Sequence, residues 1–175
     1  MTSPIYHKDV MELLTVAVEY CAYLEQADQH DRYELLDTMS KLLPLLYLKG
    51  TMLPEYESLS DDMPADYVTE ENYNIIRTNI AYIMGEQDDY LDVFVEDMRY
   101  SDTPILMTIS ENLADIYQDL KNFAYIYKIG VEEQMMAAIE QCKQNFKTDW
   151  GQKLANVLRA IHEVKYSLPT TDIDE

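Results

Sequence analysis

Apolar residues along most of the chain recur at steps of three and four, the spacing that places them on one face of an α-helix. The pattern is clearest in residues 148–168, where six apolar side chains share one face: Trp150, Leu154, Val157, Leu158, Ile161 and Val164. We predict that Thr148 caps the start of this helix, because its hydroxyl can accept a hydrogen bond from a first-turn amide. Pro169 is expected to end it, because the residue before a proline disfavours helical dihedral angles.

The same spacing predicts five further helices. They span about residues 3–27, 31–50, 69–85, 103–130 and 132–147. Pro44 predicts a kink or a break in the second of these helices. A short helical turn is expected within residues 86–102, with an edge strand as the alternative. No segment alternates with a period of two residues, so the fold class is all-α, a single-domain bundle of about six helices with acidic connecting loops. The predicted domain covers residues 1–169 and is followed by a short acidic tail, 170–175.

The charge of the chain is strongly negative, with 33 acidic and 13 basic residues among 175 and a net charge of −20. Both nucleic acid and anionic membranes need clustered cations, so the sequence predicts neither as a partner. Residues 121–166 carry seven basic and five acidic residues, a balance of +2, so the rest of the chain carries −22. This asymmetry is typical of a solvated acidic surface, and the alternative is a surface that binds a basic partner.

The cysteines and histidines are few and scattered, which limits the chemistry that the chain can perform. Cys21 and Cys142 each lie among apolar neighbours, which is typical of reduced, buried thiols in a cytoplasmic protein. The alternative is a disulfide between them. We find no basic and apolar leader typical of a signal peptide at the N-terminus. We also find no zinc, phosphate-loop or nucleophile motif. The sequence therefore predicts neither a metal nor a cofactor, and it favours a protein that is not an enzyme.

Carboxylates on the longest predicted helix form the best candidate polar site. Glu111, Asp115 and Asp119 follow one another at steps of four, which places them on one helix face. A solvated acidic face explains this spacing. The alternative is a cluster in which Asp115 and Asp119 meet a cation, with Arg159 and His162 of the last helix as candidates. Such a buried network would perturb pKa values and would mark either a binding site or a structural lock.

Two segments together resemble a known group of proteins. These are SENLADIYQDLKNFA, residues 110–124, and DWGQKLANVLRAIH, residues 149–162. They are similar to an uncharacterised bacterial all-helical family, a domain of unknown function with LADIYxDLK and WGxxLxxALRAxH signatures. The resemblance brings no activity, but it implies a recurrent polar and aromatic signature. That signature comprises Asp115, Asp119, Trp150, Gly151, Arg159 and His162. We add Tyr117 to Trp150 and Gly151 as a candidate structural element. Gly151 either lets another helix approach Trp150 closely or is simply tolerated in a first turn.

Fifteen tyrosines, several at the edges of the helical stripes, make association the favoured function. We predict a non-catalytic cytoplasmic helical protein that binds another protein or itself. The alternative is a small-molecule or metal-binding site, with or without catalysis, built from Asp115, Asp119, Arg159 and His162. The two hypotheses differ in a testable way, because the second requires these four side chains to converge around a cavity.

Overall fold

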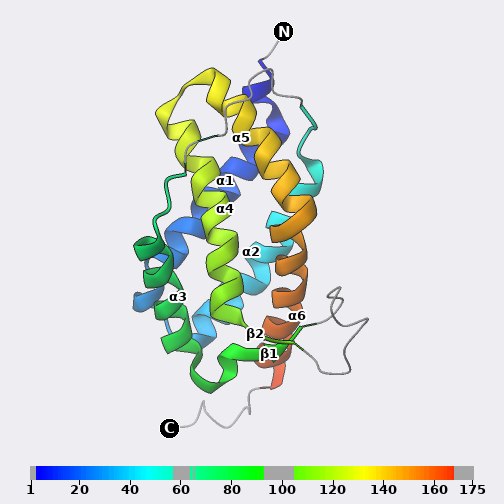
Figure 1. Ribbon diagram of the computed structural model, residues 1–175. Coiled ribbons are helices and arrows are strands. Elements are labelled where there is room, and N and C mark those ends of the chain that lie inside the picture. The colour runs from blue at the N-terminus through cyan, green and yellow to red at the C-terminus, as the bar shows by residue number, and fades with distance from the viewer. Residues whose placement is uncertain (1–2, 57–63, 65, 93–104, 168–175) are drawn as a thin grey trace.

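The computed structural model describes residues 3–56, 64, 66–92 and 105–167, and within them the protein is a bundle of six α-helices (Figure 1). The helices are α1 (Lys8–Glu25), α2 (Arg32–Met52), α3 (Glu70–Met84), α4 (Ile109–Ile129), α5 (Glu132–Asn145) and α6 (Gly151–Ser167). Short 3-10 turns are formed by Pro4–Tyr6 (η1), Ala27–Gln29 (η2) and Gly85–Asp88 (η3). The predicted all-α class and the helix number of about six are confirmed.

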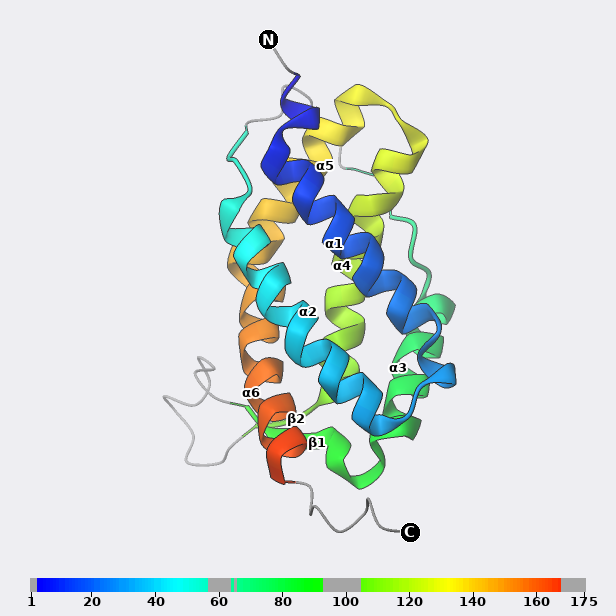
Figure 2. The same cartoon turned by 180° about the vertical axis from the view of Figure 1, so that it is seen from behind.

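Helix α4 lies at the centre of the bundle and packs against α1, α3, α5 and α6. Helix α2 closes the opposite side by packing against α1 and α6 (Figure 2). Neighbours in sequence such as α1 and α2, or α3 and α4, are antiparallel neighbours in space, whereas α6 continues in the direction of α5. Trp150 and Tyr20 are among the largest fully buried side chains of the single core cluster that results.

Local signals correctly located several helix ends. The Asp31 and Thr69 side chains accept hydrogen bonds from first-turn amides of α2 and α3. Gly85 and Gly130 follow α3 and α4 with φ of 57° and 83°, backbone angles that residues with a Cβ atom rarely adopt. The first helix begins later than predicted: η1 precedes it, and the His7 ring caps α1 by accepting from the amide of Asp9.

The start of α4 is a correction to the sequence prediction. The helix begins at Ile109, where the Thr108 hydroxyl accepts from the amide of Glu111, and not at residues 103 and 104, which lie outside the described residues. Strand β2 (Leu106–Thr108) precedes the helix and pairs antiparallel with β1 (Asp89–Leu91), with Tyr90 opposite Met107. The strand alternative is therefore correct for residues 89–91. Each strand has three residues, too few to display an alternating pattern.

The junction of α5 and α6 is a second correction, because the helix continues where we predicted a break. Residues Phe146–Trp150 form a π-helical turn (η5), in which the amide of Gly151 donates to the carbonyl of Phe146, five residues earlier. Thr148 lies within this turn and is not a cap. Its hydroxyl donates to the carbonyl of Gln144, as threonine does inside a helix.

Helix α2 also runs further than predicted, through Pro44 and past Gly50 to Met52. Gly50 does not end the helix but lies where α2 meets the π-helical turn. A Cβ atom at this position would lie 2.7 Å from two ring carbons of Phe146 and 2.9 Å from Trp150. The missing side chain is therefore what allows the two aromatic rings to pack directly against the backbone of α2.

The remaining predictions on organisation concern the ends and the acidic segments. In the described part of the chain, every helix is too short or too polar to cross a membrane. The predicted tail, 170–175, lies outside the described residues, as do residues 57–63, 65 and 93–104 of the acidic segments. The division at residue 169 accordingly stays a prediction.

Candidate functional site

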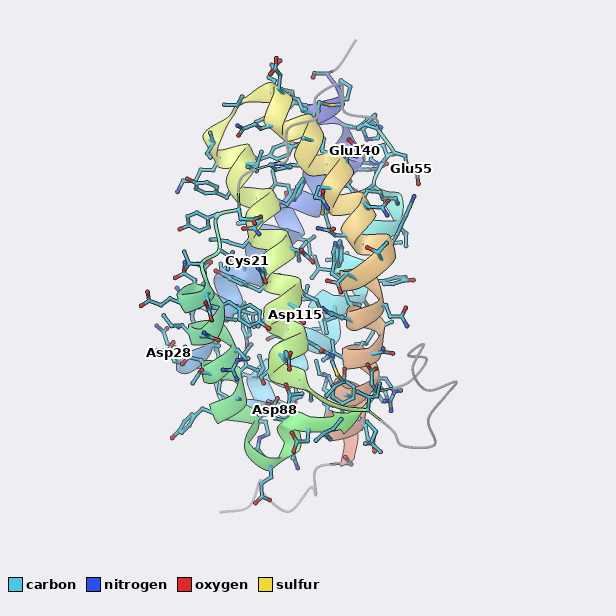
Figure 3. All side chains as sticks on the ribbon, in the orientation of Figure 1. Cys21, Asp28, Glu55, Asp88, Asp115 and Glu140 are labelled. Atoms are coloured by element: carbon cyan, nitrogen blue, oxygen red, sulfur yellow. The ribbon has the colours of Figure 1, made fainter. Side chains whose placement is uncertain are left out.

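Asp115 and Asp119 lie on successive turns of α4, beside η5 and α6. A carboxylate oxygen of Asp115 accepts a hydrogen bond from the hydroxyl of Tyr73 on α3, and the other lies 2.9 Å from the ammonium of Lys153 on α6. The same ammonium lies 2.9 Å from the carboxylate of Asp149 in η5. Figure 3 shows Asp115 near the middle of α4, the helix through the centre of the bundle. One lysine thus joins two carboxylates from different parts of the chain, and Asp115 links three helices.

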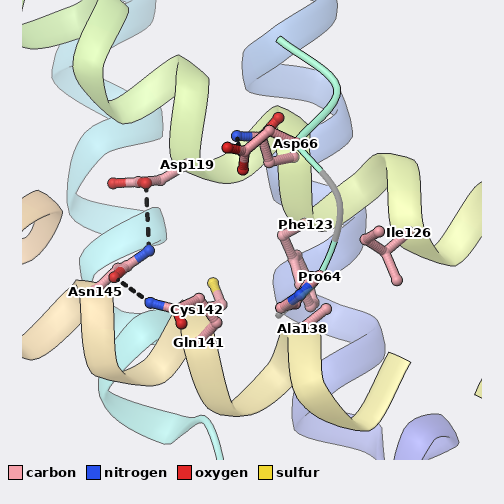
Figure 4. A pocket seen from close by; sticks show the side chains of 10 residues that line it. Pro64, Asp66, Asp119, Phe123, Ile126, Ala138, Gln141, Cys142 and Asn145 are labelled. Atoms are coloured by element: carbon pink, nitrogen blue, oxygen red, sulfur yellow. Dashed lines mark hydrogen bonds between the residues drawn. The ribbon is translucent and has the colours of Figure 1, made fainter. Parts of the chain in front are cut away.

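Asp119 lies one turn further along α4 and borders a cavity of about 150 Å³. Helix α4 lines one side, α5 lines the other, and the segment before α3 covers the third. The lining residues are Pro64, Asp66, Asp119, Asn122, Phe123, Ile126, Ala138, Gln141, Cys142 and Asn145. In Figure 4, Asp119 and Asp66 lie on one side of this space and Gln141, Cys142 and Ala138 on the other. The cavity combines an acidic end with an apolar wall.

Side-chain amides orient the polar end of this cavity. The Asn145 amide nitrogen donates to Asp119 across 3.4 Å, while its oxygen accepts from Gln141 at 2.7 Å. The Asn122 amide nitrogen donates to Asp66, also at 3.4 Å, while its oxygen accepts from two backbone amides of the segment before α3. Both bonds to carboxylates are longer than the usual range for such bonds. The amides therefore orient the carboxylates and compensate their charge only weakly.

Burial raises the pKa of Asp119 to about 7, and the nearby charge of Asp149 is the next largest cause. Asp115 and Asp66 raise this pKa further, whereas Lys153 lowers it. Lys153 acts on Asp119 from a distance, since its ion pairs are with Asp115 and Asp149. Asp119 is thus a carboxyl group that changes protonation state near neutral pH.

Arg159 and His162 do not join this cluster, which corrects the predicted four-residue site. Both are exposed. The Arg159 guanidinium donates to the carbonyl of Leu91 in β1 at 2.6 Å, and the His162 ring packs against Tyr166. They lie six and nine residues beyond Lys153, roughly 9 and 14 Å along α6. A cation from the last helix does meet Asp115, but it is Lys153. Its position four residues after Asp149 is a sequence signal for their own ion pair, whereas its contact with Asp115 has no local signal.

The predicted aromatic element is part of the packing around η5. Trp150 is fully buried, its indole N–H donates to the carbonyl of Cys142 at 3.2 Å, and its ring meets Phe146 edge-on. A Cβ atom at Gly151 would lie 2.4 Å from the carbonyl oxygen of Phe146. Gly151 therefore permits a close approach of Phe146, in the π-helical turn just before it in sequence, and not of another helix. Tyr117 is a buried core residue of α4.

The thiols are poorly suited to nucleophilic chemistry. Cys21 and Cys142 are free and buried, and burial raises the pKa of each well above the usual value for cysteine. Across the residues that the structure describes, no group of three or more histidine, cysteine, aspartate or glutamate side chains is placed to hold a metal ion. The geometry thus offers a cavity with one titrating carboxyl group and no activated nucleophile among these thiols.

A family model described as a domain of unknown function, DUF5063, matches residues 4–167. The chain belongs to this family. The crystal structure of protein BF1032 from Bacteroides fragilis is similar to it, with 45% sequence identity and a TM-score of 0.84 over 96% of this chain and 99% of that one. No curated protein matches the chain. The resemblance to an uncharacterised helical family is confirmed, and the DUF5063 description assigns no activity.

Proposed function

We propose that this DUF5063 protein is a non-catalytic binding module that docks an amphipathic helix of another protein on the outer side of α2. The docking surface, called the α2 face below, consists of the exposed side chains of α2 between residues 44 and 52. They are Pro44, Leu45, Tyr47, Leu48, Thr51 and Met52. All six are uncharged, in a chain of which 26% is charged. This uncharged exposed stretch is the observation on which the proposal rests.

Helical geometry brings the largest of these side chains together. Leu45, Leu48 and Met52 are separated by steps of three and four, so they point in one direction, away from the core positions of α2. They are 39, 52 and 40% exposed. Isolated exposed leucines are common on protein surfaces, but neighbouring ones on one helix face are typical of a surface that binds a helix.

A groove beside the α2 face extends the apolar surface towards α6. It has a volume of about 420 Å³, and Tyr47 lines it together with Phe146 and Lys147 of η5 and four residues of α6. The four are Gly151, Gln152, Ala155 and Asn156. Figure 2 shows α2 and α6 side by side on this side of the bundle. A helix lying along Leu48 could therefore insert a side chain next to Tyr47.

The charges around the α2 face indicate the chemistry of the partner. Three lysines border it in the described structure. Lys143 donates to the carbonyls of Gly50 and Thr51, Lys147 lines the groove beside Tyr47, and Lys49 pairs with Glu12. Glu55 and Glu140 lie next to Lys143 and Lys147. The partner that we propose is a helix with acidic residues beside its apolar stripe, because its carboxylates can pair with these lysines.

The broader predictions fit within this proposal. We place the protein in the cytoplasm, a compartment in which free cysteines persist. A basic partner for the acidic segments stays a separate prediction, as does self-association. The small-molecule alternative has support only at the Asp119 cavity, because Arg159 and His162 lie elsewhere.

Site-specific crosslinking in cells tests the proposal. A photo-crosslinking amino acid at position 48 should trap one partner, and the crosslinked peptide should be an amphipathic helix with acidic flanks. The same group at Ile75 of α3, which is 51% exposed, is the matched control and should not trap that partner. The double change Leu45→Gln and Leu48→Gln should then weaken binding of the purified partner at least tenfold, with a stability change within about 0.5 kcal/mol, because both side chains are exposed.

Other outcomes would contradict the proposal in distinguishable ways. A crosslink between two copies of the chain would replace it with self-association. Equal trapping from positions 48 and 75 would mean non-specific contact. An unchanged affinity of the double variant for the trapped partner would move the binding site away from the α2 face.

A further inference from the structure

We infer that the cavity bordered by Asp119 is a binding site for a small organic ammonium ion with a short apolar body. This site is separate from the α2 face and does not depend on the proposed docking function.

The inference starts from the charges around the cavity. Asp66 and Asp119 line it, and Asp115 and Asp149 lie close enough to raise the pKa of Asp119. Lys153 is the cation that offsets them, which leaves four carboxylates against one ammonium group. Among the described residues, neither Asp66 nor Asp119 has a lysine, arginine or histidine within ion-pair distance. A positive ligand would supply the missing charge, and an anion would be repelled.

The remaining walls select an organic cation over a metal ion. Phe123, Ile126, Ala138 and Pro64 contribute apolar surface, and an aromatic ring beside an ammonium group adds a favourable contact. Metal ions such as Mg²⁺ and Ca²⁺ need several converging oxygen ligands, and the described residues contain no such group. The space of about 150 Å³ equals that of roughly five water molecules in the liquid, which suits an amine of about five non-hydrogen atoms.

The amides around the carboxylates allow such a ligand to bind without rearranging the bundle. Asn145 and Asn122 donate to Asp119 and Asp66 through bonds of 3.4 Å, and the oxygens of both amides are already occupied. A ligand ammonium group has three N–H donors, so it can bond to Asp119 while these amides keep their positions. Cys142 faces the same space as a neutral thiol, because burial raises its pKa.

Binding of a cation must be coupled to the loss of a proton. Asp119 is largely protonated below its pKa of about 7, and only its ionised form attracts an ammonium ion. The ionised fraction rises from about 3% at pH 5.5 to about 90% at pH 8, so the affinity should rise about 30-fold between these values. The charges that face Asp119 are Asp115 on α4, Asp149 in η5, Lys153 on α6 and Asp66.

Titration calorimetry of the full chain with n-butylammonium tests the inference. We expect saturable binding of one ion per chain, about 30-fold tighter at pH 8 than at pH 5.5. At pH 6, repeating the titration in buffers of different ionisation enthalpy should show the release of almost one proton. Butan-1-ol, which has the same shape without the charge, and butyrate should bind at least tenfold more weakly.

Two variants and one control separate the site from the rest of the protein. Asp119→Asn should weaken n-butylammonium binding at least tenfold and remove its pH dependence. Ala138→Val, which fills the cavity without changing its charge, should also weaken binding. Glu111→Gln is the control, since Glu111 is an exposed acid of α4 outside the cavity lining, and this variant should bind as the parent does.

Several results would overturn the inference. Equal binding of butan-1-ol would mean an apolar pocket, and displacement of n-butylammonium by Mg²⁺ would mean a metal site. Binding that is unaffected by Asp119→Asn, or no saturation at about 10 mM, would remove the cavity as an ammonium site.

Discussion

Replacement of Gly50 by alanine tests the close contact between α2 and the π-helical turn. An alanine is ordinarily favoured over glycine within a helix by about 1 kcal/mol. Here the new Cβ atom would lie 2.7 Å from two ring carbons of Phe146 and 2.9 Å from Trp150, where ordinary contacts are 3.4–4 Å. Phe146 cannot retreat towards α6, because its ring and carbonyl already pack against Gly151. The rings must therefore move by several tenths of an ångström within the core.

The expected cost follows from two opposing contributions. Overpacking a core costs typically up to about 3 kcal/mol, and the helix preference of alanine offsets about 1 kcal/mol of it. We expect Gly50→Ala to lower the free energy of unfolding by about 2 kcal/mol, which corresponds to a fall in Tm of about 4–8 °C for a chain of this length. Differential scanning calorimetry measures the fall, and urea unfolding measures the free energy directly.

Two variants make the result specific. Thr51→Ala changes the next residue of α2, which is exposed, and its Tm should stay within about 2 °C of the parent value. Phe146→Leu frees space, so adding Gly50→Ala to it should cost at least 1 kcal/mol less than in the parent. A Tm of Gly50→Ala equal to or above that of the parent would refute the proposed close contact.

Three further predictions concern charge and thiol chemistry. The pKa of Asp119 is raised in the folded state, so its contribution to stability is fully present below about pH 4 and is lost as the pH rises to about 7. Asp119→Asn should therefore gain stability relative to the parent between pH 4 and pH 7, by up to about 4 kcal/mol in urea unfolding curves, and a gain independent of pH would contradict this. Lys153→Met should lower the free energy of unfolding at pH 8 by about 1–2 kcal/mol, because Asp115 loses its ion pair; a salt-independent loss would argue against that cause. Cys21 and Cys142 should react with iodoacetamide only when the protein unfolds, and mass spectrometry of labelled native protein would reveal an exception.

The helices were predictable from the sequence because their signals are local. Asp31, Thr69, Gly85 and Gly130 each act on a turn within four residues of themselves, and a periodic stripe identifies the buried face directly. The predicted helix start at Thr148 was wrong because it also relied on a local signal alone. Threonine is a good cap, but here the helix continues through η5, and the Thr148 hydroxyl bonds within the helix.

The site was only partly predictable because it depends on how distant helices are aligned. The sequence placed Asp115 and Asp119 on one face of α4, and it suggested a cation from the last helix. Which residue supplies that cation depends on the axial position of α6 along α4, which brings Lys153 to Asp115 and carries Arg159 to β1. The cavity also requires Asn145 on α5 to lie opposite α4, a contact between segments 26 residues apart.

The π-helical turn has a mechanical consequence for the two surfaces on either side of it. On one side, Asn145 ends α5 at the cavity, and on the other side Phe146 and Gly151 border the groove next to Tyr47. Because no loop separates the two surfaces, we expect their occupants to be linked through η5. Titration of the docked helix with and without n-butylammonium measures this link, and each ligand should alter the affinity of the other by the same factor.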